Sequence, residues 1–343
     1  MKIVFVFGGS GFIGTNLVSL LLRKNFKVVN IDMQSYASVP EKFKDYKNKK
    51  NYIFKKININ KFNQIEKLYL KYKPKFIFNL AAMSHVDRSI DNPRRTIENN
   101  IISTLNLLEI IRLNKKNKNF KRLIHLSTDE VYGDVSKSSK EKDSLEPSSP
   151  YSSSKASSDL MIRSYIKTYK IPSIIIRACN NFGPYQFTEK FIPTILLNLK
   201  KNKKIPVYGN GFQKREWIYV VDFCEILIKF TNQGSDGLIY NVGSGKRVSN
   251  LKLISEIHKI LKLKRPLKKY IKHVLDRPGH DKNYALNSSQ SKKILNGYNI
   301  NPFEKNLYKT INWYMNNLKW LNYTKKKYKG QRLGISKWLK ALY

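Results

Sequence analysis

A glycine-rich motif near the amino end of the sequence constrains the fold more than any other feature. The motif Gly8-Gly9-Ser10-Gly11-Phe12-Ile13-Gly14 follows an apolar run typical of a buried strand, Ile3–Phe7, and leads into a helical pattern over Ile13–Arg23. Glycines permit a tight turn and a close approach to a pyrophosphate, and the helix offers free N–H groups at its positive end. We therefore predict a dinucleotide-binding turn. Its expected cofactor-binding residues are Gly8, Gly11, Phe12, Ile13 and Gly14.

A second strand supports this prediction and indicates which dinucleotide is bound. The run Val28–Ile31 ends at Asp32, about 20 residues beyond the motif, where an acid can bond the hydroxyl groups of the adenosine ribose. A carboxylate at this position would repel a 2′-phosphate, so NAD is favoured over NADP. An ordinary turn between a strand and a helix would not require this acid.

Short apolar runs alternate with helical patterns through the first half of the chain. Further strands are predicted at Tyr52–Phe54, Phe76–Asn79, Arg122–Ser127 and Ser173–Ile176. Further helices are predicted at Ile65–Tyr72, Thr96–Leu113 and Ser152–Tyr169. This alternation predicts an α/β fold with a doubly wound parallel sheet of the Rossmann type.

The alternation loosens after about Ala178. Helices are predicted at Phe191–Leu199, Asp222–Phe230, Leu251–Leu261 and Glu304–Asn317, between loops that contain proline and glycine. We expect a smaller, mostly C-terminal α/β lobe there. The predicted division is a NAD-binding domain over residues 1–177 and a mainly substrate-binding lobe over residues 178–343, with segments that can return to the first domain.

The charge of the chain suggests a different function, nucleic-acid binding. The chain has 65 Lys and Arg against 24 Asp and Glu, a formal net charge of +41. Its lysine-rich stretches, such as Lys42–Lys50, Lys115–Lys121 and Lys200–Lys204, lie far apart and on no recognisable nucleic-acid-binding motif. We therefore interpret the charge mainly as composition and expect no specific nucleic-acid partner. An inactive, basic nucleic-acid-binding protein remains the alternative from a different class.

Composition excludes several other classes of protein. With 41% hydrophobic and 12% aromatic residues, the chain is too apolar to be a disordered basic tail. No apolar run approaches the roughly 18 residues of a membrane-spanning helix, so we expect no membrane partner. The amino end lacks the small-residue cleavage site of a signal peptide. Two cysteines, Cys179 and Cys224, support neither a disulfide framework nor a zinc site, so we expect a cytoplasmic protein without a metal.

A tyrosine and a lysine are the first catalytic candidates. Tyr151 and Lys155 are four residues apart on a predicted helix, so their side chains point to one face. A phenol with a pKa of about 10 is a poor base at neutral pH, and a nearby ammonium group favours the phenolate. The same lysine can reach ribose hydroxyls of the nicotinamide half of the cofactor.

Two adjacent acids are the second set of candidates. Thr128, Asp129 and Glu130 follow the predicted strand Arg122–Ser127, at the carboxyl edge where open α/β sheets bind ligands. A simple alcohol dehydrogenase needs only a hydroxyl group here. Two carboxyl groups are useful when one must remove a proton from carbon while the other delivers a proton to a leaving hydroxyl.

These motifs resemble those of a known superfamily, the extended short-chain dehydrogenases/reductases. Its pattern is matched by Gly8-x-x-Gly11-x-x-Gly14, Asn79-Leu80-Ala81-Ala82 and Tyr151-Ser-Ser-Ser-Lys155. The run Thr128-Asp129-Glu130 resembles the nucleotide-sugar 4,6-dehydratases, and most closely those acting on dTDP-glucose. The resemblance covers nearly the whole chain. Further matching segments are Ser84–Ser89, Ser149–Asp159, Asn180–Tyr185, Glu189–Pro193, Val207–Gly209, Gln213–Trp217, Asp276–Asp281 and Gly330–Gly334.

The resemblance implies a lyase that converts dTDP-D-glucose to dTDP-4-keto-6-deoxy-D-glucose with NAD, a step that feeds deoxysugar synthesis. Tyr151, aided by Thr128 and Lys155, would take the proton of the 4-hydroxyl while NAD accepts hydride from C4. Glu130 would remove the C5 proton, and Asp129 would protonate the departing 6-hydroxyl. The hydride then returns to C6, so the cofactor is unchanged by the cycle and stays bound.

The resemblance also implies which residues bind cofactor and substrate. Beyond the glycine motif and Asp32, the NAD-binding residues are Asn58, Ile59, Leu80, Ala81, Ala82, Asn99, Tyr151, Lys155 and Asn181. The substrate-binding residues are Ser84, Thr128, Asn180, Lys190, Phe191, Pro206, Val207, Tyr208, Arg215, Asn250, Arg277 and His280. The cations of this set would meet the diphosphate, and Phe191 with residues 206–208 would form an apolar slot for the base. A homodimer is implied, with Thr96–Leu113 and Ser152–Tyr169 among its paired helices.

Two residues depart from the family pattern, and some alternatives stay open. Asn58 stands where an Asp near the adenine is usual, and Glu216 replaces an Asp before Trp217. A 4,6-dehydratase acting on UDP-glucose is an alternative, because the choice of base depends on the shape of the pocket. A 4-epimerase or a decarboxylase of the same superfamily is a weaker one, because neither reaction needs Asp129 to expel a hydroxyl.

Overall fold

A seven-stranded parallel sheet forms the centre of the molecule. The computed structural model describes residues 1–46, 48–298 and 300–327. The strands lie in the order β10-β6-β5-β4-β1-β2-β3, and every neighbouring pair is parallel. Their bounds are β1 (Ile3–Phe7), β2 (Lys27–Asp32), β3 (Tyr52–Lys56), β4 (Phe76–Asn79), β5 (Arg122–Thr128), β6 (Ser173–Ala178) and β10 (Ile239–Val242). The prediction of a doubly wound α/β sheet is confirmed.

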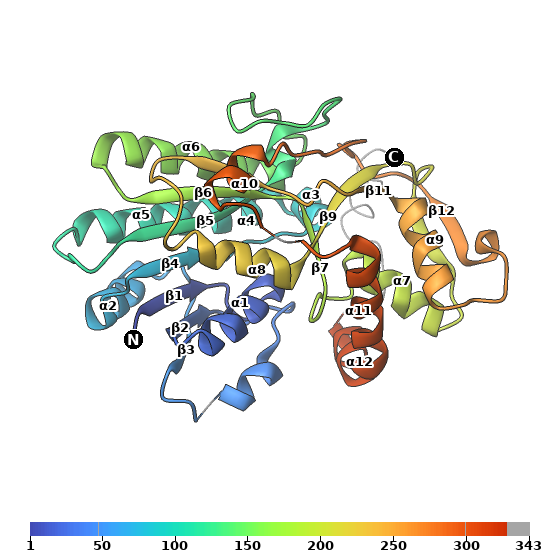
Figure 1. Ribbon diagram of the computed structural model, residues 1–343, viewed down its shortest axis with the longest axis horizontal. Coiled ribbons are helices and arrows are strands. Elements are labelled where there is room, and N and C mark those ends of the chain that lie inside the picture. Colours follow the sequence, from blue (N-terminus) through green and yellow to red (C-terminus); the bar gives the residue numbers. More distant parts are fainter. Residues whose placement is uncertain (47, 299, 328–343) are drawn as a thin grey trace.

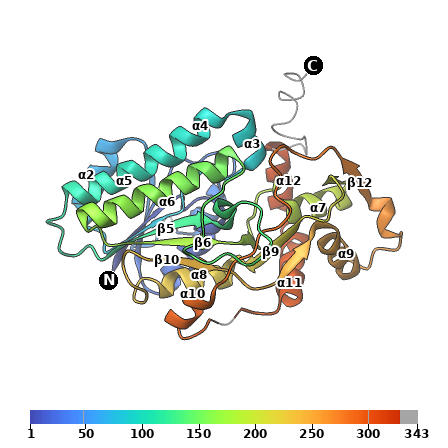
Figure 2. The same ribbon diagram turned by 90° about the horizontal axis from the view of Figure 1, so that it is seen from above.

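Helices cover both faces of this sheet (Figures 1 and 2). One face carries α2 (Phe62–Tyr72), α5 (Ser103–Leu113) and α6 (Pro150–Tyr169), and the other carries α1 (Phe12–Arg23), α8 (Val220–Lys229) and α10 (Ser289–Ile294). The strand residues alternate between the two apolar cores: Val4 and Val6 of β1 pack with α1 and α8, whereas Phe5 and Phe7 pack with α2 and α5. Burial on both faces explains why these strands are mainly apolar.

The helix expected at Thr96–Leu113 is interrupted by a wider turn. It consists of α4 (Pro93–Ile97), a π-helical turn over Glu98–Ile102, and α5. Within the turn, the amide of buried Asn100 accepts from the N–H of Met83 (2.8 Å) and donates to the Ser154 hydroxyl (2.9 Å). These hydrogen bonds satisfy buried polar groups and so hold the wider π-helical turn at Asn100. The apolar spacing of the sequence does not reveal such a turn.

The second half of the chain builds a smaller lobe beside the carboxyl edge of the sheet (Figure 1). Two small sheets, β11-β9-β7 and β12-β8, comprise β7 (Asn180–Phe182), β8 (Ile205–Tyr208), β9 (Lys214–Tyr219), β11 (Arg247–Ser249) and β12 (Ile271–Val274). The lobe's helices are α7 (Phe191–Lys200), α9 (Asn250–Ile260), α11 (Phe303–Asn316) and α12 (Leu318–Lys327). They pack with β8 and β9 around a separate apolar core. The segments β10, α8 and α10 return to the large sheet. In the part of the chain that the structure describes, no helix has the length and apolarity to cross a membrane.

Candidate active site

The predicted glycine turn connects β1 to α1 at the carboxyl edge of the sheet. Gly8 has a φ of +75°, a conformation that favours glycine. A methyl group on Gly14 would lie 2.1 Å from the carbonyl oxygen of Gly8, so the turn and the helix are in direct contact. Gly11, the N-cap of α1, has no side-chain cap, and the first N–H groups of the helix therefore stay available to an anion.

Asp32 ends β2 beside this turn. Its carboxylate accepts hydrogen bonds from the N–H of Ser10 (2.9 Å) and the N–H of Gln34 (2.6 Å). Burial raises the pKa of Asp32, and these two bonds oppose that rise. The acid therefore braces the glycine turn in addition to its predicted contact with ribose.

The other predicted cofactor residues lie on several different elements. Leu80, Ala81 and Ala82 follow β4, and a methyl group on Gly8 would lie 2.8 Å from the backbone of Ala81. Asn58 accepts from the N–H of Asn60 (3.0 Å), so this departure from the family pattern caps its own loop. The remaining positions are Ile59 in the apolar core, Asn99 on the π turn, and Asn181 on β7.

The Tyr–Lys pair lies at the start of α6 because the helix begins immediately before it. Ser149 forms a capping box with Ser152, and Pro150 occupies the first turn. The N–H of Tyr151 donates to the Ser89 hydroxyl (3.1 Å). Both Tyr151 and Lys155 are buried, with 8% and 3% exposure.

Lys155 contacts a histidine that sequence reasoning missed. Its Nζ lies 3.0 Å from Nε2 of His125 on β5, and Nδ1 of His125 lies 3.0 Å from the amide nitrogen of Asn79. Burial lowers the pKa of His125 well below its usual range, so this imidazole is neutral. Burial also lowers the pKa of Lys155 to about 8, although Asp159, one turn along α6, opposes the fall.

The phenol of Tyr151 does not have the lowered pKa that the sequence argument expected. Burial raises its pKa, and the carboxyl groups of Glu130 and Asp129 raise it further, while a hydrogen bond with Thr128 opposes them. In this structure the ammonium group of Lys155 is directed to His125, and it is not among the main influences on the phenol. Desolvation therefore outweighs the effect of the neighbouring lysine.

The two adjacent acids occupy different electrostatic environments. They begin a 3₁₀ turn, Asp129–Tyr132, in which the Thr128 hydroxyl donates to Asp129 Oδ1 (3.2 Å) and accepts from the N–H of Glu130 (3.3 Å). Burial raises the pKa of Asp129 well above its usual range, and the charges of Glu130 and Glu216 add to this. Burial also raises the pKa of Glu130, but Arg277, Arg215 and Lys190 oppose it. Asp129 is therefore suited to hold a proton, and Glu130 faces the cations that stabilise its charge.

Three cations converge on this site from the lobe. Arg215 on β9 donates to the Asp281 carbonyl (2.8 Å), and its guanidinium lies 4.2 Å from the ring centroid of Tyr284. Lys190 donates to the carbonyl oxygen of Ser84 (2.8 Å), which brings two predicted substrate residues together. Arg277 lies next to the buried carboxylate of Asp87. Each of the three influences the pKa of Glu130, so the predicted diphosphate cations and the acid pair share one site.

The predicted slot for the base is only partly supported by strand geometry. Along β8, Val207 is fully buried in the core of the lobe, whereas Pro206 and Tyr208 point to the other, partly exposed face. The ring of Tyr208 packs edge-on against His280, with the ring centroids 6.0 Å apart. Burial, Arg277 and Arg215 lower the pKa of His280 to about 4. The other predicted substrate residues are Asn180 at the start of β7, Phe191 at the start of α7, and Asn250 at the start of α9.

Glu216, which stands where the family usually has an Asp, also binds two backbone N–H groups. Its carboxylate accepts from the N–H groups of Gly245 (2.6 Å) and Leu286 (3.0 Å), and the side chain is fully buried. Sequence reasoning also missed Asp159, which pairs with buried Arg177 (2.9 Å) behind Lys155. Acidic residues are scarce in this chain, so their location in apolar segments was the available signal.

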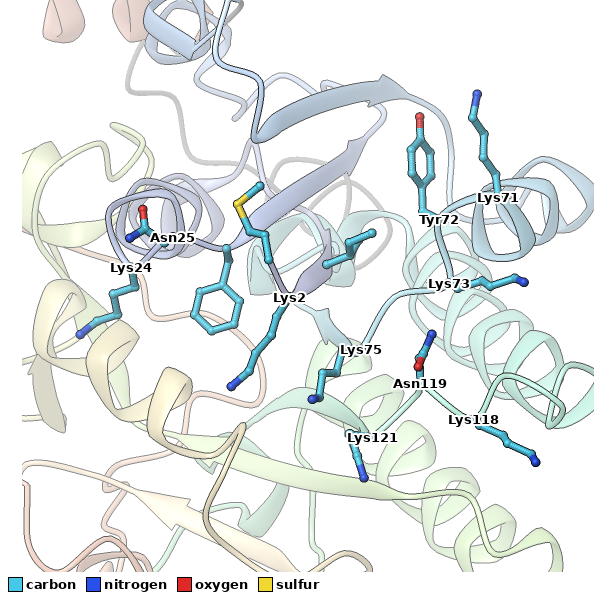
Figure 3. A pocket seen from close by; sticks show the side chains of 13 residues that line it. Lys2, Lys24, Asn25, Lys71, Tyr72, Lys73, Lys75, Lys118, Asn119 and Lys121 are labelled. Carbon is cyan, nitrogen blue, oxygen red and sulfur yellow. The ribbon is translucent and has the colours of Figure 1, made fainter.

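A basic hollow lies elsewhere, at the amino-terminal edge of the sheet. It measures about 1170 Å³, and none of the predicted site residues lines it. Figure 3 shows its lysines around the ends of β1, α2 and β4; they are Lys2, Lys24, Lys71, Lys73, Lys75, Lys118 and Lys121. This hollow is therefore separate from the candidate active site. Among the described residues, no group of three or more His, Cys, Asp or Glu side chains is arranged to hold a metal ion.

A Rossmann sheet with a glycine turn, a Tyr–Lys pair and two adjacent acids at its carboxyl edge defines a dehydratase of the short-chain dehydrogenase/reductase type. Residues 5–305 match the family described as GDP-mannose 4,6 dehydratase. The chain is 38% identical to dTDP-glucose 4,6-dehydratase of Salmonella typhimurium, over 95% of this chain and 96% of that protein. The chain therefore belongs to the GDP-mannose 4,6 dehydratase family and, within it, to the dTDP-glucose 4,6-dehydratases. The expected family is confirmed.

Solved structures agree with this assignment. The crystal structure of dTDP-glucose 4,6-dehydratase from Bacillus anthracis in complex with NAD superposes with a TM-score of 0.87 at 34% identity, covering 95% of this chain and 100% of that one. The enzyme of the same name from Streptomyces venezuelae, also with NAD bound, has a TM-score of 0.87 at 34% identity, covering 93% and 98% of the two chains. The tail segment Gly330–Gly334, which also resembles the family, lies outside the described residues.

Proposed function

We propose that this chain is a hydro-lyase that converts dTDP-D-glucose to dTDP-4-keto-6-deoxy-D-glucose with bound NAD. The observation that carries this proposal is the pair Asp129 and Glu130, two neighbouring carboxyl groups whose environments differ beside the Tyr–Lys pair. Hydride transfer alone needs no such pair, whereas loss of water needs an acid and a base. Relatives with the same fold and more than 30% identity are dTDP-glucose 4,6-dehydratases.

The turn between β1 and α1 fits a dinucleotide. Gly14 leaves no room for a side chain, α1 presents uncapped N–H groups, and Asp32 stands at the end of β2. When bound, NAD takes hydride from C4 of the sugar and returns it to C6. The chain's own contribution is to hold the sugar and to move its protons.

Each proton movement has a candidate group. Tyr151 takes the proton of the 4-hydroxyl as its phenolate, the form that the hydrogen bond with Thr128 favours and that burial and the two neighbouring acids oppose. The resulting ketone acidifies the neighbouring C5–H, and Glu130 removes this proton with the support of the three cations. Asp129 holds its proton because it is desolvated, and it delivers that proton to the 6-hydroxyl as the C6–O bond breaks. Water thus leaves across C5 and C6, and Glu130 gives its proton back to C5 as the hydride is returned to C6. The proton taken from the 4-hydroxyl by Tyr151 balances the one given up by Asp129, so the net loss is one water.

The substrate lobe, mainly residues 178–343, supplies Arg215, Arg277 and Lys190 for the diphosphate. Guanidinium groups suit this role because they bond phosphate oxygens in pairs. Pro206 and Tyr208, on the outer face of β8, form the slot for the base. We place the protein in the cytoplasm, because its two cysteines are buried free thiols, which a reducing compartment preserves.

The test is to incubate the purified protein with dTDP-glucose and no added reductant. We expect a product lighter by one water, with the alkaline absorbance of a 4-keto-6-deoxy sugar. UDP-glucose is the matched comparison. Conversion of UDP-glucose alone would refute the thymidine assignment, and epimerisation without loss of water would refute dehydration. Salt-dependent nucleic-acid binding without turnover would support the nucleic-acid-binding alternative.

We also propose a homodimer through the helices on the α5–α6 face. Four large apolar side chains there are 41–55% exposed: Ile97, Ile102, Leu113 and Leu160. Their burial against a second copy would remove apolar surface from water. Light scattering should give twice the mass of the chain, and Leu160→Glu should shift the mass towards the monomer. A wild-type monomer at micromolar concentration would refute the proposal.

A further inference from the structure

A buried acid, Asp87, joins the sheet domain to the lobe at the substrate site. It lies in the first turn of α3 (Val86–Asp91) and is 5% exposed. Its Oδ2 accepts a hydrogen bond from the hydroxyl of Tyr208 (2.6 Å), and its Oδ1 accepts one from Nη1 of Arg277 (3.4 Å). Both carboxylate oxygens are therefore used, each by a lobe residue that the sequence predicted to bind substrate.

The two partners of Asp87 face different parts of the site. Tyr208 lies on the outer face of β8 with Pro206 and packs against His280, where the base of the nucleotide is proposed to bind. Arg277 is the charge that most strongly opposes the raised pKa of Glu130, the carboxylate proposed to remove the C5 proton. Asp87 is also the first of the attractive charges that act on Arg277. One carboxylate thus connects the base slot to the proton-abstracting acid.

We propose that Asp87 is a positioning residue that fixes Tyr208 for recognition of the base and restrains Arg277 from neutralising Glu130. The proposal rests on the proposed function. It assigns Asp87 no contact with the reacting atoms, because its effects pass through the two side chains that it holds. The chain offers variants that separate these effects.

Substitution of Asp87 by asparagine removes the charge and keeps the shape. The amide still hydrogen-bonds the Tyr208 hydroxyl, which can both donate and accept. Loss of the negative charge leaves Arg277 with Glu130 as its carboxylate partner, so the ionised form of Glu130 is favoured and its pKa falls. Because Glu130 acts as a base in its ionised form, the acidic limb of kcat should move to lower pH, by about one unit. The groups acting on or acted on by Glu130 are Arg277, Arg215, Lys190, Asp281, Asp129, Tyr151 and Tyr284.

A different effect is expected from Tyr208→Phe, which removes only the hydroxyl held by Asp87. Discrimination between thymine and uracil depends on how the slot encloses one methyl group, a contrast of about 10–200-fold. We therefore expect the ratio of dTDP to dUDP affinity, two nucleotides that differ only by this methyl group, to fall by about tenfold, with the acidic limb unmoved. The diphosphate is common to both nucleotides, so changes in its binding cancel in the ratio. Asp87→Ala should show both effects.

Asp222→Asn is the matched control. Asp222 on α8 accepts hydrogen bonds from the N–H of Asn301 (3.2 Å) and the amide of Asn306 (2.9 Å), so it also connects the sheet domain to the lobe, away from the substrate site. This variant should change neither the affinity ratio nor the acidic limb. Retention of NAD and the melting temperature show that each variant is folded.

The measurements are calorimetric affinities for dTDP and dUDP, and pH profiles of kcat with dTDP-glucose. The proposal is overturned if Asp87→Asn leaves the acidic limb in place, if Tyr208→Phe keeps the affinity ratio, or if Asp222→Asn reproduces either effect. Failure of the wild type to dehydrate dTDP-glucose would instead overturn the proposed function. In that case the affinity ratio, which needs no turnover, still decides whether Asp87 and Tyr208 position the base.

Discussion

Replacing Asp129 with asparagine should separate the oxidation step from the loss of water. The side chain is 2% exposed, and its Oδ1 accepts a hydrogen bond from Thr128 (3.2 Å). Asparagine has the same size and can accept the same bond. Because burial and the charge of Glu130 already favour the protonated, neutral form of Asp129, the neutral amide introduces little electrostatic change. The variant therefore loses mainly the proton that the 6-hydroxyl needs.

The expected magnitude follows from that single loss. A positioned general acid contributes about 10²–10⁴-fold to its step. At 1.36 kcal/mol per factor of ten, this corresponds to about 2.7–5.4 kcal/mol of barrier height. Hydride removal from C4 depends on Tyr151 and not on Asp129, so it should keep a rate within a few-fold of the wild type.

The assay is a single turnover with dTDP-glucose in a stopped-flow instrument. Absorbance of the reduced cofactor reports oxidation at C4, and quenched samples weighed by mass spectrometry report loss of water. In Asp129→Asn the reduced cofactor should accumulate and persist. Thr128→Val is the contrasting variant, because loss of the hydroxyl next to Tyr151 should slow oxidation itself. Equal slowing of oxidation and dehydration in Asp129→Asn would refute the division of roles.

Three further predictions concern the cofactor turn, the active-site lysine and the basic hollow. Gly14→Ala places a methyl group 2.1 Å from the Gly8 carbonyl, so it should cost about 1–3 kcal/mol of stability and reduce NAD retention; an unchanged melting temperature would contradict this. Lys155 has a pKa of about 8, and its ammonium form is lost as pH rises through that value, so kcat/KM should fall above about pH 8; a profile that stays flat a full unit higher would refute a role for the charge. Glutamine at Lys73 and Lys121 should weaken retention on a polyphosphate resin at low salt more than two such substitutions elsewhere do. At physiological salt the Debye length is about 8 Å, so screening of the charges should remove this difference.

Short-range sequence patterns predicted the sheet domain because each feature of it is local. Ile3–Phe7 is a strand with the predicted bounds, and the glycine turn follows it as expected. The helix at Thr96–Leu113 contains a π turn that depends on Asn100 bonding to Met83 and Ser154, which are distant in the sequence. Periodicity records which residues are apolar, and it carries no information about such partners.

Candidate residues were found by their motifs, but their electrostatics came from the fold. The sequence places Tyr151 four residues before Lys155, yet burial raises the phenol pKa and directs the lysine to His125. Val207 belongs to a matching motif, yet its side chain lies in the core of the lobe. Burial and charge depend on all neighbours in space, and most of those neighbours come from other parts of the chain.

The sequence by itself determined the dinucleotide turn and the pair Asp129–Glu130, because each rests on residues close together along the chain. It also indicated the parallel sheet and the family, through patterns and motifs spread along the chain. Only the tertiary structure decided how those acids differ. Arg277 and Lys190 reach Glu130 from separate segments of the lobe, while Glu216 and desolvation act on Asp129. It also revealed Asp87 between Tyr208 and Arg277. Electrostatic interactions act through space, so they are set only when the lobe packs against the sheet.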